Sequence, residues 1–105
     1  KNVTMMRELG GQRQAQFPDA VTERGRKHLD VLIDLVRKGH EAELVFVVQR
    51  VDCDAFAPAV DIDMAYAAKL KEAMQCGVQI SVWPVHINEK GLQLQAAAPL
   101  PIADL

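Results

Sequence analysis

Four cationic side chains stand close together where a predicted helix begins. They are Arg24, Arg26, Lys27 and His28, and a Phe-Pro-Asp-Ala turn at 17–20 precedes them. The helix dipole places partial positive charge at a helix N-terminus, where it favours anions over further cations. Phosphate is the anion that suits such a position best. The cluster therefore favours phosphate binding, and a solvated helix face with scattered charge is the alternative.

Two arginines outside this helix are further candidates for phosphate contact. Arg13 lies in the polar segment before the turn, and Arg50 follows a predicted central strand. The carboxyl ends of parallel strands are where α/β sheets commonly place their sites, so we expect Arg50 to face the same cleft as His28. A surface ion pair between Arg50 and a nearby acid is the alternative.

The acidic residues offer weaker candidates for chemistry. Two Asp-x-Asp pairs, at 52–54 and 61–63, have the oxygen ligands that divalent metals use, but neither has the glycine and terminal glutamate of an EF-hand loop. Helix capping is the simpler role for Asp61 and Asp63. For Asp54 we expect only solvation at the surface. We therefore predict no metal or other cofactor in this chain.

Length and composition indicate one globular domain. The chain has 105 residues, of which 50% are hydrophobic and 25% are charged, so a core of adequate size is expected. No apolar run approaches the roughly 18 residues that a membrane helix needs, and no signal-peptide core is present. Cys53 and Cys76 lack metal-site spacing. We expect reduced, packed thiols in a cytoplasmic protein, with a disulfide or a metal site as the alternative.

The net charge of −2 conceals an asymmetry along the chain. Residues 1–28 carry six basic and three acidic side chains, whereas residues 29–105 carry six basic and eleven acidic ones. A basic front and an acidic back would orient the domain in the field of a polyanion. The signal is weak, because segments of this charge occur by chance in many proteins.

Hydrophobic periodicity predicts two helices. Thr22 is the expected cap of the first, and Gly39 is its expected end. Its apolar stripe consists of Leu29, Leu32, Ile33 and Val36, widened by Leu35. Asp63 is the expected cap of the second helix, Met64 to Cys76, and Gly77 its stop. The buried stripe of this helix is predicted to be Tyr66, Leu70, Ala73 and Met74.

The remaining segments predict strands and connections. We expect strands at 1–6, 42–49 and 78–87, and a short returning strand at 92–94 after a turn. The strand at 42–49 should be covered on both faces, and Pro84 should place its strand at a sheet edge or bend it. Segment 7–16 is predicted to be a mobile loop, segment 52–61 a connection, and segment 96–105 an extended tail against the core. This order predicts an α/β fold with a mixed sheet flanked by helices.

Several motifs together resemble the sugar fermentation stimulation protein (SfsA) family. They are FPDAVTERGRKHL at 17–29, LVFVVQR at 44–50, the Phe56-Ala-Pro-Ala run, Ile62-Asp63-x-x-Tyr66-Ala67, Gly77-Val78 before a strand, and Leu100-Pro101. They keep the order and approximate spacing of the family and span almost the whole chain.

The resemblance implies a fold and a function. Members of the family look like two-domain proteins, in which an N-terminal OB-like barrel precedes a domain similar to PD-(D/E)XK nucleases. By this resemblance residues 1–105 are a fragment, the C-terminal part of the nuclease-like domain, and the OB-like domain is absent. The family is described as binding double-stranded DNA with little sequence preference and as regulating sugar (maltose) use in bacteria. The expected partner is thus DNA and no membrane, with a homodimer as a further expectation.

The resemblance also implies a role for the first residue. In the family a Glu-x-Lys element is followed by a Ser/Asn-Val-Thr segment. Lys1-Asn2-Val3-Thr4 matches the junction of the two, so by this resemblance Lys1 corresponds to the lysine of the element. The two carboxylates that would hold Mg²⁺ lie upstream of the motif and are absent here. By analogy with nuclease-like folds, Arg24, Lys27 and His28 would contact the scissile or flanking phosphate, and catalysis by His28 is a weaker alternative to a hydrogen bond with a carbonyl.

Three functions stay open at this point. The first is sequence-tolerant DNA binding through Arg13, Arg50 and the cluster of Arg24, Arg26, Lys27 and His28. The second is a Mg²⁺-dependent nuclease in the full-length protein, although we expect this chain alone not to cleave DNA. The third is a protein-interaction or dimerisation module that uses an edge strand near Pro84.

Overall fold

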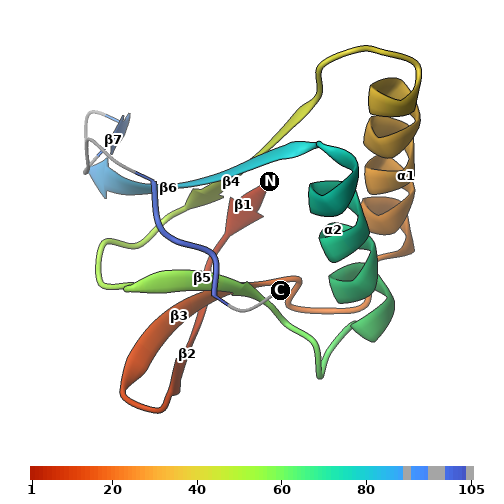
Figure 1. The fold of residues 1–105 in the computed structure, drawn as a ribbon. Coiled ribbons are helices and arrows are strands. Elements are labelled where there is room, and N and C mark those ends of the chain that lie inside the picture. The colour runs from red at the N-terminus through yellow and green to blue at the C-terminus, as the bar shows by residue number, and fades with distance from the viewer. Residues whose placement is uncertain (89–90, 95–98, 104–105) are drawn as a thin grey trace. The chain divides into compact units, whose positions relative to one another are not determined.

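The structure, a computed structural model, describes residues 1–88, 91–94 and 99–103. In this part of the chain three strands precede the first of two helices, two strands lie between the helices, and two strands follow the second helix. The described chain divides into two compact units. The sheet unit comprises Lys1–Phe17, Val45–Ala57 and Ser81–Leu105, and the helical unit comprises Pro18–Leu44 and Pro58–Ile80. Figure 1 shows the elements in chain order. The predicted α/β class is confirmed.

The first helix of the helical unit, α1, spans Glu23–Arg37 and begins at the predicted cap. The Thr22 hydroxyl oxygen accepts a hydrogen bond from the Gly25 amide at 3.0 Å. This bond satisfies one of the amides that the first turn of a helix leaves unpaired. Gly39 follows the helix with φ of 90°, in the left-handed region that glycine adopts without steric penalty. Both predicted ends of this helix are therefore confirmed.

The apolar stripe of α1 is narrower than predicted. Leu29 and Ile33 are buried, and Leu32 and Val36 are half-buried. Leu35 is 36% exposed, because two residues of helix turn its side chain about 200° away from Ile33. The prediction that Leu35 widens the buried stripe is wrong.

The second helix, α2, spans Met64–Cys76, with the predicted bounds. Its cap is Asp63, whose carboxylate accepts a hydrogen bond from the Tyr66 amide at 2.9 Å, and Gly77 ends it in the left-handed conformation. The residues buried along it are Tyr66, Ala67, Leu70 and Ala73. Met74 is 37% exposed, so the predicted stripe ends one residue early.

Gly25 marks a point of close packing between α1 and α2. A Cβ atom on Gly25 would lie 2.9 Å from Thr22 Cγ2 and 3.1 Å from Tyr66 Cε2, both closer than ordinary van der Waals contact. Tyr66 is fully buried, so its ring has little room to move. Glycine inside a helix lowers its stability by about 1 kcal/mol relative to alanine. The close approach of the two helices is the physical reason for glycine here.

The four-stranded sheet has the order β1-β4-β6-β7. Strand β1 (Asn2–Val3) pairs in parallel with β4 (Glu43–Val48). Every second residue of β4 from Leu44 to Val48 is buried, and the valines between them are half-buried. One face of β4 is therefore covered completely and the other only in part, whereas the sequence predicted complete cover of both.

Strand β6 (Gln79–Asn88) lies between β4 and β7 (Gly91–Leu94), so it is not an edge strand of its sheet. Of the two alternatives predicted for Pro84, the edge position is therefore wrong, and the bend stays a prediction. Antiparallel pairing with β7 runs from Val85 opposite Leu94 to Asn88 opposite Gly91, so it begins one residue after the proline. A proline cannot donate a ladder hydrogen bond, and here it stands just outside the paired stretch. The returning strand at 92–94 is confirmed. The proposed interaction edge near Pro84 is not an edge.

The segment predicted as a mobile loop is a β-hairpin. Strands β2 (Met5–Leu9) and β3 (Gln12–Phe17) pair antiparallel across Gly10 and Gly11, and they project from the lower left of Figure 1. The two glycines have φ of 57° and 79°. A two-residue hairpin turn of this kind needs positive φ at both positions, which is why a Gly-Gly pair suits it.

Side-chain amides account for the polar character of β3. The Nε2 atom of Gln16 donates to Oε1 of Gln14 at 3.0 Å, and Nε2 of Gln14 donates to Oε1 of Gln12 at 2.8 Å. These bonds let glutamines occupy a partly covered strand face. The third strand of this sheet, β5 (Ala55–Pro58), lies within the segment predicted as a connection.

Three aromatic rings form the centre of the sheet unit. The Phe46 ring lies 5.5 Å from the Phe17 ring and 4.6 Å from the Phe56 ring, measured between centroids. Phe46 and Phe56 are fully buried, and Phe56 belongs to β5, so both rings are part of the core of this unit.

The described part of the tail, residues 99–103, lies along the sheet unit as predicted. The Phe56 amide donates to the Pro101 carbonyl, and the Ala103 amide donates to the Phe56 carbonyl. The Leu100 amide donates to the carbonyl of Val82 in β6. The other predicted tail residues, 96–98 and 104–105, lie outside the described residues.

Replacing Gly25 with alanine should destabilise the protein, although alanine is the better helix former. We expect the free energy of unfolding to fall by about 1–3 kcal/mol, because the added methyl group overpacks the contact with Thr22 and Tyr66. Urea denaturation measures this change. Val31→Ala is the matched control, because Val31 is 58% exposed on the same helix; its effect should stay within about 0.5 kcal/mol. A Gly25→Ala protein as stable as the wild type would contradict the close-packing argument.

Candidate phosphate-binding site

The structure brings three of the four cluster residues onto one exposed face of α1. Lys27 and His28 follow Arg24 by three and four residues, which places them beside it on the helix surface. All three are exposed. Arg26 is half-buried and lies about 200° around the helix from Arg24, on the other side. The predicted cluster is therefore a face of Arg24, Lys27 and His28, with Arg26 apart from it.

The positive charges of Arg24 and Lys27 are only weakly neutralised among the described residues. Lys27 Nζ lies 3.5 Å from Glu23 Oε1, and both side chains are more than two-thirds exposed. Exposed pairs of this kind contribute at most about 1 kcal/mol and are screened by salt. Among residues 1–88, 91–94 and 99–103, Arg24 and Arg26 form no ion pair or hydrogen bond through their side chains. The guanidinium of Arg24 is therefore available to an external anion.

The start of α1 is fixed by a contact that local sequence does not reveal. Asp63 caps α2, as predicted, and its second oxygen accepts a hydrogen bond from the Thr22 backbone amide at 2.9 Å. These two hydrogen bonds lower the pKa of the Asp63 carboxyl, and the charge of Arg26 lowers it further. Thr22 and Asp63 are 41 residues apart, so no spacing rule predicts this contact.

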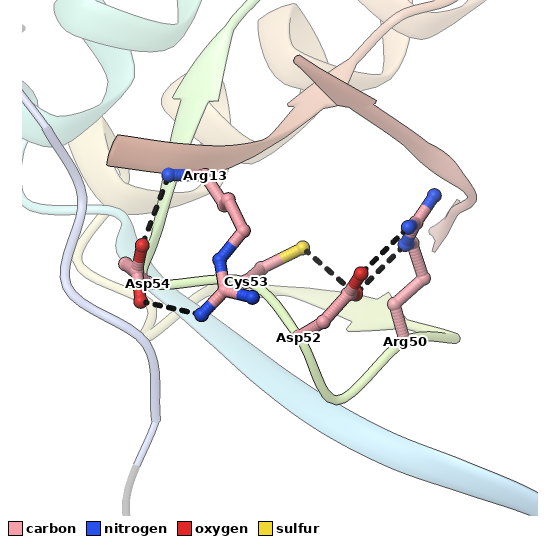
Figure 2. A network of polar contacts seen from close by, with 5 residues as sticks. All are labelled: Arg13, Arg50, Asp52, Cys53 and Asp54. Carbon is pink, nitrogen blue, oxygen red and sulfur yellow. Dashed lines mark hydrogen bonds and ion pairs between the residues drawn. The ribbon is translucent and has the colours of Figure 1, made fainter. Parts of the chain in front are cut away.

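The two predicted arginines of the sheet unit are both held by carboxylates (Figure 2). Nε and Nη2 of Arg50 donate to the two carboxylate oxygens of Asp52 at 2.9 and 2.7 Å, a bidentate pair. Nη2 of Arg13 lies 3.6 Å from Asp54 Oδ1, and the Arg13 backbone amide donates to Oδ2 at 3.0 Å. Arg50 therefore forms the ion pair that the sequence offered as the alternative to a phosphate contact. Asp54 is paired with Arg13, whereas only solvation was expected for it.

These contacts change the titration of both acids. The hydrogen bonds from Arg50 lower the pKa of Asp52 to about 2. The backbone amide and then the guanidinium of Arg13 lower the pKa of Asp54. The Cys53 thiol, between them in the chain, has a raised pKa because it is partly buried and near Asp52. A phosphate that binds Arg13 or Arg50 must therefore compete with a carboxylate, and a phosphate role for these two residues stays a prediction.

Lys1 takes part in the sheet through its backbone. Its carbonyl accepts a hydrogen bond from the Val47 amide at 2.7 Å, beside β4. The residue is half-buried. Its predicted correspondence to a catalytic lysine is not tested by this geometry, and neither is the expectation that Arg50 and His28 share a cleft.

No group of three or more His, Cys, Asp or Glu side chains that could hold a metal ion occurs among the described residues. Asp63 uses both oxygens for backbone amides, and Asp52 and Asp54 are paired with arginines. Cys53 and Cys76 are free thiols. Lys1 is a cation and cannot replace a missing carboxylate ligand. The described residues therefore do not fit a divalent cation by themselves, and we derive no metal-dependent step from them.

Comparison with known proteins decides the family. The model of the "Sugar fermentation stimulation protein RE domain" matches residues 1–91. The chain belongs to the sugar fermentation stimulation protein family. It is 47% identical over 94 residues to the homologue from Bdellovibrio bacteriovorus, covering 90% of this chain and 37% of that protein. It is 41% identical over all 105 residues to the homologue from Brucella ovis, covering 42% of that protein.

A solved member of the family has the same fold. The structure of Pyrococcus furiosus SfsA, determined in complex with Ca²⁺, superposes with a TM-score of 0.83 at 29% identity. The match covers 99% of this chain and 43% of that one. This chain thus spans about two-fifths of the length of its relatives in the sugar fermentation stimulation protein family. Within the described part, neither helix is long and apolar enough to cross a membrane.

Replacing Arg50 with methionine should return the pKa of Asp52 from about 2 toward its ordinary value of 3.8. Because this pKa is lower in the folded than in the unfolded protein, the pair stabilises the fold above about pH 4. That contribution disappears as the pH falls toward 2. NMR titration of the Asp52 carboxyl carbon measures the change. Arg13→Met is the control, since it removes the partner of Asp54 and should leave most of the Asp52 shift in place. An unchanged low pKa in Arg50→Met would contradict the assignment.

Proposed function

We propose that this chain binds double-stranded DNA through its phosphates, with little preference for sequence. The observation that carries the proposal is the exposed face of Arg24, Lys27 and His28 at the start of α1, on which Arg24 has no partner among the described residues. Phosphate contacts supply affinity without sequence information, because every nucleotide presents the same group. Membership of the sugar fermentation stimulation protein family supports the proposal.

The biological setting follows from the same family membership. We propose that the whole protein acts in the bacterial cytoplasm and influences genes of sugar (maltose) fermentation. The positive charges of Arg24 and Lys27 attract phosphate to this face, whereas the N-terminus of α1 itself is already capped by Thr22 and held by the carboxylate of Asp63. Arg26, Arg13 and Arg50 are secondary candidates, because Arg26 lies on another helix face and the other two are engaged by carboxylates.

A second candidate function is a metal-dependent nuclease in the longer protein. Lys1 stands beside β4 and matches the lysine of a Glu-x-Lys element, and the Pyrococcus furiosus relative was solved with Ca²⁺. Mg²⁺ would supply a Lewis acid for attack on the phosphodiester bond, held by carboxylates outside this chain. This chain would contribute Lys1.

The binding proposal predicts a salt-dependent affinity for duplex DNA. Fluorescence anisotropy with a labelled duplex of arbitrary sequence, at several salt concentrations, should show the affinity falling linearly on logarithmic axes. Arg24→Ala should weaken binding about tenfold for all sequences alike and reduce the salt slope by about one. Lys71→Ala removes one charge from an exposed position of α2 and is the matched control with a small expected effect. Affinity that does not change with salt would refute the proposal.

The nuclease candidate predicts that this chain alone does not cut DNA. Supercoiled plasmid incubated with the chain and Mg²⁺ or Mn²⁺ should remain intact on an agarose gel, because the described residues lack the oxygen ligands that the metal needs. The longer protein, tested in parallel, serves as the comparison. Nicking by this chain that persists through repurification and disappears with a Lys1→Ala substitution would show that it carries a complete centre.

A further inference from the structure

The carboxylate of Asp63 connects the first turns of both helices. Its Oδ1 accepts from the Tyr66 amide and its Oδ2 from the Thr22 amide, each at 2.9 Å. Thr22 in turn caps α1 through its hydroxyl, which accepts from Gly25. The backbone that begins α1 is therefore held to the backbone that begins α2 by one side chain. Cutting this connection would release the first turn of α1 and not its buried middle.

The carboxylate of Asp63 is buried and has no oxygen without a hydrogen bond. The residue is 7% exposed, and both of its oxygens already accept backbone hydrogen bonds. Buried carboxylates are costly unless they are paired in this way. The missing side chain of Gly25 lets Thr22 and the Tyr66 ring close around the same point. The arrangement is thus rigid and fully occupied, and it stands one turn or less from Arg24 and Lys27 along α1.

We infer that Asp63 is a positioning residue for the phosphate-binding face, in that its carboxylate fixes the first turn of α1 and thereby the place of Arg24, Lys27 and His28. The expected effect of Asp63 on DNA binding rests on the proposed function, whereas its expected effect on the order of α1 does not. An anion-binding face is most effective when its donors are already in place, since ordering them on binding costs free energy. Asp63 itself does not contact the phosphate.

Two charge-matched variants separate positioning from simple electrostatics. Asp63→Asn and Asp30→Asn each remove one negative charge from the helical unit, and Asp30 is an exposed residue of α1 paired with Lys69. If charge alone mattered, both variants would bind duplex DNA at least as tightly as the wild type. Positioning predicts that Asp63→Asn binds about three- to tenfold more weakly, because the asparagine side chain has only one acceptor oxygen for two amides. Asp30→Asn should bind equally well or better.

A second variant keeps the test valid if Asp63→Asn folds poorly. Serine is a good N-cap, so Asp63→Ser retains a bond to the Tyr66 amide but has no second acceptor atom for Thr22. Amide hydrogen exchange provides a readout without DNA: residues 23–28 should exchange faster in the Asp63 variants, whereas residues 29–37 should keep their protection. Asp30→Asn should leave both segments unchanged.

The outcomes distinguish this inference from the proposed function. If the wild type shows no salt-dependent DNA binding, the proposed function fails, and the exchange rates of residues 23–28 still decide whether Asp63 orders that turn. If the wild type and Asp30→Asn bind DNA and the Asp63 variants bind equally well, the inference is overturned. Unchanged exchange in residues 23–28 of both Asp63 variants would overturn it as well.

Discussion

A single buried carboxylate fixes the geometry on which the helical unit depends. The start of a helix leaves backbone amides unpaired, and Asp63 satisfies one amide at the start of each helix. Its negative charge also lies where both helix dipoles favour an anion. The desolvation of a buried acid is offset by these bonds and by the charge of Arg26 nearby. The close contact of Gly25 with Thr22 and Tyr66 lies at the same place, so cap, dipole and packing all support the same geometry.

The arginines of the sheet unit and those of α1 differ in whether a carboxylate of the chain already pairs with them. Arg50 and Arg13 are engaged by Asp52 and Asp54, and the bidentate geometry of Arg50 is the kind that a phosphate would also require. Binding a phosphate there exchanges one anion for another. A phosphate bound at Arg24 would replace only water, so the net gain in free energy would be larger for the same type of contact. The position of the carboxylates, more than the number of arginines, therefore decides which surface suits a polyanion.

Local rules predicted the helices of this chain well and its sheets less well. Thr22, Asp63, Gly39 and Gly77 each act within one turn of a helix, and their roles follow from the sequence around them. The hairpin was missed because its strands are polar, and the glutamine side chains that bond to one another look like loop residues when only their polarity is considered. Strand β5 was missed because it has only four residues and ends on Pro58, which gives too short a pattern.

For the candidate site, the identity of the residues could be predicted but their partners could not. The sequence shows Arg24, Lys27 and His28 as candidates, and helical spacing explains why they share one face in the structure. It left open whether Arg50 would be free or paired, since Asp52 and Asp54 are both close to it in the chain. The bond between Asp63 and Thr22 spans 41 residues and depends on how α1 and α2 pack. Such contacts arise only once the tertiary structure brings the two helix starts together.

Binding and cleavage of DNA make separate demands on this scaffold. Attraction of the phosphate backbone requires fixed positive charge, which α1 presents at its first turns. Hydrolysis requires hard oxygen ligands that converge on a metal ion, whereas Asp52 and Asp54 are paired with arginines and Asp63 accepts from two backbone amides. Freeing Asp52 or Asp54 for a metal would break an ion pair. Freeing Asp63 would remove the hydrogen bonds to the backbone amides at the starts of both helices. Asp52, Asp54 and Asp63 therefore hold parts of the fold in place, whereas the basic face of α1 stays exposed.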